Sequence, residues 1–166
     1  QPNNSGWVTG SGQVGSGSDN PPRAGDLDNN DPVRGFISFD MSQIPQGALI
    51  EDARLILPNA NPDLEQMNDP FGGLGCLSIE ALSYPLPLDT SAYDEFSYPI
   101  DCYSGPPTDI DVLIDIEEAL DLEFSEVQFR LNFELDSDDN SIACLYILNG
   151  APRLEVTYSN KSVRAG

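Results

Sequence analysis

The segment from Arg34 to Leu57 constrains the fold more than any other part of the chain. Apolar side chains fall at every second position on both sides of a Pro-Gln-Gly turn that begins at Pro45. Alternation of this kind, bounded by Pro and Gly, is typical of half-buried strands. The residues expected to share the buried side are Ile37, Phe39, Met41, Ala53, Leu55 and Leu57. We therefore predict strands at about 34–41 and 48–57.

Other segments extend this pattern to the whole chain. Strands are predicted near 77–81, 125–135, 142–148 and 153–158, and the alternation in 125–135 predicts one face in water. Segment 85–107 is rich in Pro and Tyr and predicts an ordered loop with one helical turn near 91–96. The fold class is therefore all-β: a two-sheet antiparallel β-sandwich, jelly-roll-like, with one short helix around 109–123.

Two regions differ in composition. Residues 1–18 form a Gly/Ser-rich N-terminal arm, and residues 19–166 have the size of a single β-sandwich domain. Gly and Ser are typical of a flexible linker, yet Gly6–Thr9 has a strand-like centre. We expect the arm to be held in place, either by its own sandwich or by a neighbouring copy.

The first pair of predicted strands also carries a family-like motif. Phe39-Asp40 at a strand end, Pro45 in the turn and the spacing Ile50, Ala53, Leu55, Leu57 resemble extracellular β-sandwich domains with the DNRLRE signature. The late segments 127–133 and 152–158 match as well, so the resemblance spans roughly 25–158. That family is grouped with carbohydrate-binding modules. The resemblance implies an extracellular domain, and the grouping with carbohydrate-binding modules implies a sugar ligand.

The net charge of the chain excludes several classes of binding partner. The chain has seven Lys and Arg residues and 28 Asp and Glu residues, which gives a formal net charge of −21. Such a surface repels nucleic acid and anionic membranes.

The chain has no histidine, which removes the commonest general base, and we expect no enzyme activity. No apolar run reaches the length of a membrane-spanning helix, so no membrane insertion is expected. Because the chain begins at Gln1 rather than Met, we expect a processed, secreted protein.

Cysteines and glycosylation motifs are consistent with that location. Cys76, Cys102 and Cys144 permit one disulfide and one thiol, with three possible pairings. The remaining cysteine is expected to be a small buried side chain rather than an intermolecular link. Asn3 and Asn160 each begin an N-x-Ser motif and are candidate glycosylation sites.

Two acidic loops are candidate calcium sites. Calcium prefers several carboxylate and carbonyl oxygens, and each loop offers them within a few residues. Asp and Asn also dominate ordinary turns, where they bind local backbone amides, and this alternative stays open. The candidate ligands are Asp26, Asp28 and Asp31 in the first loop and Asp136, Asp138 and Asn140 in the second.

Tyrosines in predicted loops are candidates for stacking on sugar rings. They are Tyr84, Tyr93, Tyr98 and Tyr103. The alternative is that these rings cap the core with their hydroxyl groups in water.

The function predicted first is a non-catalytic secreted structural subunit that self-assembles into an extracellular fibre or surface layer. A sandwich edge is a template for a strand from another chain. The N-terminal arm, anchored by Trp7 and Val8, is predicted to dock on a neighbouring copy, and the tail after Tyr158 is a second possible donor. The alternative is a carbohydrate-binding module of an extracellular enzyme or cell-wall protein.

Overall fold

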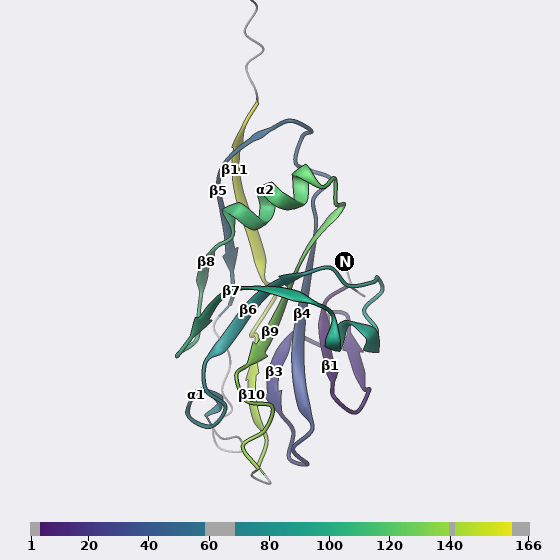
Figure 1. Cartoon of the computed structure of the whole chain (residues 1–166), viewed down its shortest axis with the longest axis vertical. Helices are drawn as coiled ribbons and strands as arrows, with labels where there is room; N and C mark the ends of the chain where they lie inside the picture. The colour runs from purple at the N-terminus through teal and green to yellow at the C-terminus, as the bar shows by residue number, and fades with distance from the viewer. Residues whose placement is uncertain (1–3, 59–68, 140–141, 161–166) are drawn as a thin grey trace, which may run out of the picture.

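Two antiparallel sheets make up the fold in the computed structural model, which describes residues 4–58, 69–139 and 142–160 (Figure 1). In the larger sheet the strands hydrogen-bond in the order β10-β3-β4-β9-β6-β7, and β1 pairs with both β4 and β2. The smaller sheet has the order β11-β5-β8. The predicted all-β, two-sheet antiparallel sandwich is confirmed. The strands are β1 Gly6–Thr9, β2 Val14–Ser16, β3 Arg23–Asp26, β4 Pro32–Asp40, β5 Leu49–Ile56, β6 Leu77–Leu82, β7 Ser97–Tyr103, β8 Asp109–Asp111, β9 Glu126–Phe133, β10 Cys144–Ile147 and β11 Arg153–Ser159.

The main core lies between the two sheets. Strands β4 and β9 pair in antiparallel register, with Ile37 opposite Phe129, so their inward side chains meet on one face. Leu55 of β5 packs into the same cluster from the smaller sheet. All three side chains are buried, and for Ile37 and Leu55 the alternation around the Pro45 turn predicted this.

The predicted loop at 85–107 contains a strand, so that part of the prediction is wrong. Strand β7 pairs with β6 along its length, and the register shifts between Ile79 and Glu80. Strand β7 is the end of the larger sheet and contains Pro99, which is tolerated on an edge strand because only one side is hydrogen-bonded. A short 3₁₀ helix, η1 Thr90–Asp94, confirms the predicted helical turn.

The predicted helix is present but begins later than expected. Asp109–Asp111 forms β8 and pairs with β5, because Ile110 is buried in the core. Helix α2 then runs from Leu113 to Asp121 across one end of the sandwich (Figure 1). Ile116 and Ala119 form its buried side. A second helix, α1 Pro70–Gly73, lies near the opposite end of the molecule.

The outer face of β9 is covered, which corrects the prediction of a sheet with one face in water. Gln128 and Arg130 are both buried. A second apolar cluster lies over this face and draws on β1, β4 and the segment around η1. It consists of Val8, Phe36, Tyr84, Leu88 and Ala92.

The N-terminal arm belongs to the larger sheet of its own chain. Trp7 lies opposite Gly35 of β4 and opposite Gly15 of β2. A Cβ atom on Gly15 would fall 2.3 Å from the Trp7 ring, so the indole needs a glycine there. Val8 is fully buried. The predicted docking of this arm on a neighbouring copy would therefore have to displace strand pairs that the chain already makes.

Candidate metal centre and binding grooves

Two of the predicted metal ligands, Asp26 and Asp138, lie together at the end of β3. Asp26 ends β3 and lies opposite Cys144 of β10. Asp138 follows in the loop after β9. One ligand atom from each of these three side chains lies within 4.8 Å of the others. The two acidic loops that the sequence presents separately thus contribute to one cluster, which we call the Asp26 cluster.

Asp26 is a fully buried member of the cluster. Its side chain is 0% exposed, and its Oδ2 accepts a hydrogen bond from the Asp138 backbone N–H at 3.2 Å. Its Oδ1 is buried without any hydrogen-bond partner among the described residues. Burial raises the pKa of this carboxyl group. Burial, and then the neighbouring Asp138, raises the pKa of the Cys144 thiol to about 12.

Helix α1 closes the cluster on another side. A Cβ atom on Gly73 would lie 3.2 Å from Asp138 Oδ2 and 3.6 Å from Cys144 Sγ, so the helix backbone packs directly on these groups. Asp69 caps the helix by accepting a hydrogen bond from the Phe71 N–H at 3.1 Å. The cluster therefore joins β3, β10, the loop after β9 and α1.

The other predicted metal ligands lie elsewhere. Asp28 is exposed, and Asp31 accepts hydrogen bonds from the backbone N–H and the hydroxyl of Ser11. Asp136 lies 3.8 Å from the Arg34 guanidinium. Asn140 lies outside the described residues. Among the described candidates, only Asp26 and Asp138 share a site.

Three of the four candidate tyrosines are used within the fold. Tyr84 is buried and its hydroxyl donates a hydrogen bond to the Asn4 carbonyl at 2.6 Å. The Tyr93 ring stacks on Arg34, whose Cζ is 4.1 Å from the ring centroid. Tyr103 packs against the main core. Tyr98 alone is widely exposed, at 64%.

Tyr98 lines a groove that we call the aromatic groove. Phe96 is 73% exposed and meets Tyr98 edge to face, with ring centroids 5.0 Å apart. The groove encloses about 330 Å³, and Phe124 extends its apolar lining. Its polar lining comes from Glu95, Asp115, Glu118, Glu126 and Gln128. Sequence reasoning missed Phe96, although its position beside a predicted sugar-stacking tyrosine was the available signal.

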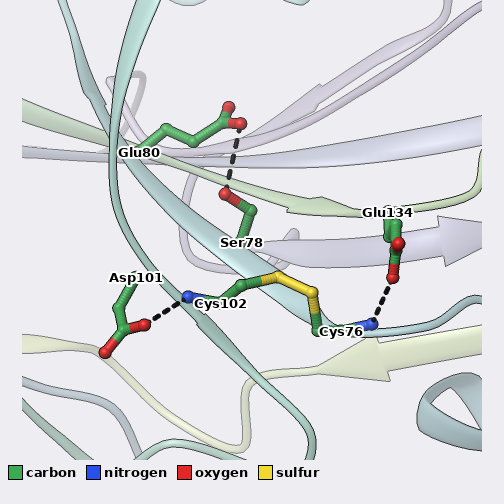
Figure 2. The surroundings of a disulfide bond; sticks show 6 residues. All are labelled: Cys76, Ser78, Glu80, Asp101, Cys102 and Glu134. Atoms are coloured by element: carbon green, nitrogen blue, oxygen red, sulfur yellow. Dashed lines mark hydrogen bonds between the residues drawn. A yellow bond between two sulfur atoms is a disulfide. The ribbon is translucent and has the colours of Figure 1, made fainter.

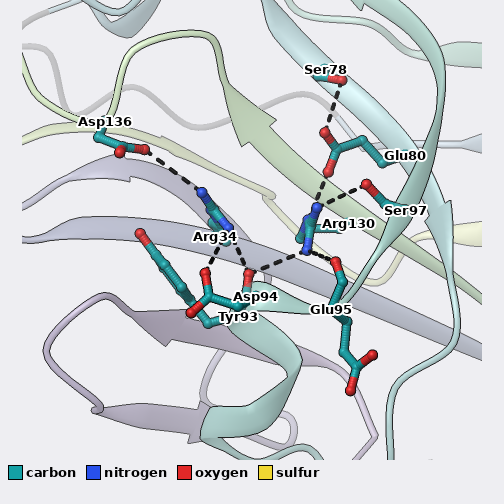
Figure 3. Close-up of polar contacts among 9 residues, drawn as sticks. All are labelled: Arg34, Ser78, Glu80, Tyr93, Asp94, Glu95, Ser97, Arg130 and Asp136. Atoms are coloured by element: carbon teal, nitrogen blue, oxygen red, sulfur yellow. Dashed lines mark hydrogen bonds and ion pairs between the residues drawn. The ribbon is translucent and has the colours of Figure 1, made fainter.

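A buried arginine fixes the segment that carries Phe96 (Figure 3). Arg130 Nε lies 2.6 Å from Glu80 Oε1, and both side chains are largely buried. The same guanidinium donates hydrogen bonds to the Glu95 carbonyl and the Ser97 hydroxyl, each at 2.8 Å. The residues on both sides of Phe96 are therefore tied to the centre of the larger sheet.

A second, larger hollow lies where the chain crosses from β10 to β11, and we call it the edge groove. It encloses about 610 Å³. One wall is Ile37, Ser38 and Phe39 of β4, and another is the segment from Leu148 to Pro152 that leads into β11. Ser5 and residues of the loop before β3 complete the lining.

One disulfide joins Cys76 to Cys102 and so connects β7 to the start of β6 (Figure 2). Around it, the Cys102 N–H donates to Asp101 Oδ1 at 2.8 Å and the Cys76 N–H donates to Glu134 Oε2 at 3.4 Å. Cys144 is the free, buried thiol, as expected for the unpaired cysteine. Of the two N-x-Ser asparagines, Asn160 is exposed directly after β11, and Asn3 lies outside the described residues.

Comparison with models of known protein families found none that matches this chain, and comparison with curated proteins found no match either. The resemblance to DNRLRE-type domains therefore stays a prediction. Within the described residues, no helix is both long enough and apolar enough to span a bilayer.

Proposed function

We propose that the chain is a non-catalytic, secreted structural subunit that assembles with copies of itself into an extracellular fibre or surface layer. The observation that supports this proposal is the free edge of the smaller sheet at β11. Among the described strands, β11 hydrogen-bonds only with β5, so its other edge leaves backbone groups unpaired. Unpaired edges of this kind bind strands from other chains. The Cys76–Cys102 disulfide favours an oxidising location outside the cell.

The edge groove gives an added strand an apolar surface to pack against. It lies at the start of β11, where Ile37 and Phe39 of β4 form part of its lining. The smaller sheet has three strands and faces a larger sheet of eight. A fourth strand beside β11 would extend the smaller sheet over this groove.

The occupant we propose is the C-terminal segment 160–166 of a second copy. It holds Lys161 and Arg164, two of the seven basic residues, and no acidic residue, whereas the chain as a whole has a net charge of −21. Fully extended, seven residues span about 23 Å, which matches a strand of seven residues such as β11. Each subunit would then donate its tail to the next, a head-to-tail contact that generates an open polymer.

Charge also sets the conditions for assembly. Copies of so acidic a protein repel one another, and this repulsion is screened over about 10 Å at 0.1 M salt. We expect polymers to form at physiological salt and to dissociate at low ionic strength.

The test is deletion of residues 160–166, with sedimentation velocity and electron microscopy as measurements. The truncated protein is expected to stay monomeric under conditions in which the full chain polymerises. Ala151→Trp, which fills the edge groove and leaves the tail intact, should have the same effect. Ser162→Ala is the matched control and should polymerise normally. Polymers of the truncated protein would rule out tail donation.

A second candidate function, carbohydrate binding, is favoured by the aromatic groove. Exposed aromatic rings stack on the apolar faces of sugars, and carboxylate and amide groups bind hydroxyls. Phe96 and Tyr98 supply the rings, while Glu118 and Glu126 supply carboxylates in the lining of the same groove.

This candidate predicts that glycan binding depends on the exposed ring pair. On a glycan array, Phe96→Ala and Tyr98→Ala should each weaken binding at least tenfold. The control is Tyr158→Ala, since Tyr158 is exposed on β11 and does not line the aromatic groove. Equal loss in the control, or no glycan signal for the monomer, would remove this candidate.

A further inference from the structure

We infer that Asp26 and Asp138 bind a calcium ion, which joins the end of β3 to the loop after β9. The inference starts from the state of Asp26. Its side chain is wholly buried, and its Oδ1 receives no hydrogen bond within the described part of the chain. A buried carboxylate is strongly disfavoured unless a counter-charge or hydrogen bonds compensate it.

The described side chains do not supply that counter-charge. The ion pairs in the described part of the chain are made by Arg34, Arg54, Arg130 and Arg153, and none of them involves Asp26. Arg23 shares strand β3 with Asp26, but its guanidinium lies over the Trp7 ring, 5.3 Å from the centroid. The nearest carboxylate, Asp138, adds a second negative charge to the cluster. A cation from solution would neutralise both.

The donor set favours a hard cation. Asp26 and Asp138 offer carboxylate oxygens, and calcium completes its six to eight ligands with backbone carbonyls and water. A structural zinc site needs about four Cys or His ligands. This chain has no histidine, and two of its three cysteines form the disulfide, which leaves Cys144 alone. We therefore assign the oxygens, and not the thiol, to the ion.

A bound ion would have a structural consequence that is independent of either proposed function. The Asp26 cluster joins strands β3 and β10 to the loop after β9 and to α1, which are adjacent in space but far apart in the sequence. Calcium would hold these elements together and remove part of the net negative charge. In a secreted protein, the ion is supplied by the surroundings.

The first test is calorimetric titration of chelator-treated protein with calcium chloride. We expect one site with a dissociation constant of about 0.1–1 mM, the range of extracellular calcium modules. Asp26→Asn and Asp138→Asn should each weaken binding at least tenfold. Asp28→Asn is the matched control, because Asp28 belongs to the same acidic loop but is exposed. Equal weakening in this control would show only diffuse attraction to an acidic surface and would overturn the site.

The second test compares melting temperatures with chelator and with calcium. Calcium should raise the melting temperature of the wild type and of Cys144→Ala. In chelator, Asp26→Asn should melt at or above the wild-type temperature, since the substitution removes an uncompensated buried charge, and calcium should not stabilise it further. A wild type unaffected by about 10 mM calcium would contradict the inference. So would stabilisation by zinc alone that disappears in Cys144→Ala.

Discussion

Arg130 shows how one residue can organise a surface far from its own position in the sequence. It lies in the middle of β9, yet its guanidinium contacts Glu80 on β6, the Glu95 carbonyl before Phe96 and the Ser97 hydroxyl after it. Charged groups taken out of water need such complete pairing. Arg34 lies nearby, with its guanidinium on the Tyr93 ring, and donates a hydrogen bond of 2.6 Å to the Tyr93 carbonyl (Figure 3).

We expect Glu80→Gln to lower the free energy of unfolding by about 3 kcal/mol, because it leaves the buried Arg130 without its carboxylate. Denaturant unfolding measures this directly. Glu51→Gln, an exposed position on the neighbouring sheet, should change stability by less than about 0.5 kcal/mol. Similar values for the two variants would mean that the buried pair adds nothing to stability.

At the scale of elements, strand β7 depends on covalent support. It is the last strand of the larger sheet, pairs only with β6 among the described strands, and contains Pro99. The Cys76–Cys102 disulfide closes a loop of 26 residues across this pair (Figure 2). Because β7 carries Tyr98, the disulfide also holds one wall of the aromatic groove.

Replacing both Cys76 and Cys102 by Ser should reduce the free energy of unfolding by about 3.5 kcal/mol, the value expected for a closed loop of this length. Thermal unfolding of the reduced wild type is the control, and it should show the same loss. If the double variant were as stable as the oxidised protein, β7 would be held by its hydrogen bonds alone.

The strands and helices also differ in how well the sequence pattern predicted them. Strands β4, β5 and β9 were predictable because period-two alternation depends only on neighbouring residues. Strand β7 was missed because an edge strand with Pro and little burial carries no alternation. Helix α2 was placed too early, since the acidic residues of β8 resemble a helix start. The burial of Arg130 could not be predicted, because the cover over β9 comes from β1 and the segment around η1, remote in sequence.

The same reasoning applies to the candidate sites. The acidic loops around Asp26 and Asp138 were recognisable from composition, but their meeting depends on the β3–β10 pairing. Asp136 and Asp31 were indistinguishable from them in the sequence and turn out to bind Arg34 and Ser11. Tyr84 was likewise indistinguishable from Tyr98 until the fold buried it.

At the scale of the whole molecule, the two sheets differ in how their edges are used. The larger sheet takes in the N-terminal segment as β1 and β2, and Val8 of β1 also belongs to the apolar cluster over the outer face. The smaller sheet ends at β11, whose outer edge is unpaired among the described strands and begins beside the edge groove. The assembly we propose uses the β11 edge, because a strand donated there would extend the smaller sheet over the edge groove.

Hydrogen–deuterium exchange of the β11 amides, in monomer and in polymer, tests strand donation most directly. In the monomer, amides on the free edge of residues 153–159 should exchange rapidly, while those bonded to β5 are protected. In the polymer both sets of β11 amides should be protected, and the exchange rates of the β7 amides should not change. Free-edge amides that exchange as fast in the polymer as in the monomer would contradict assembly through β11.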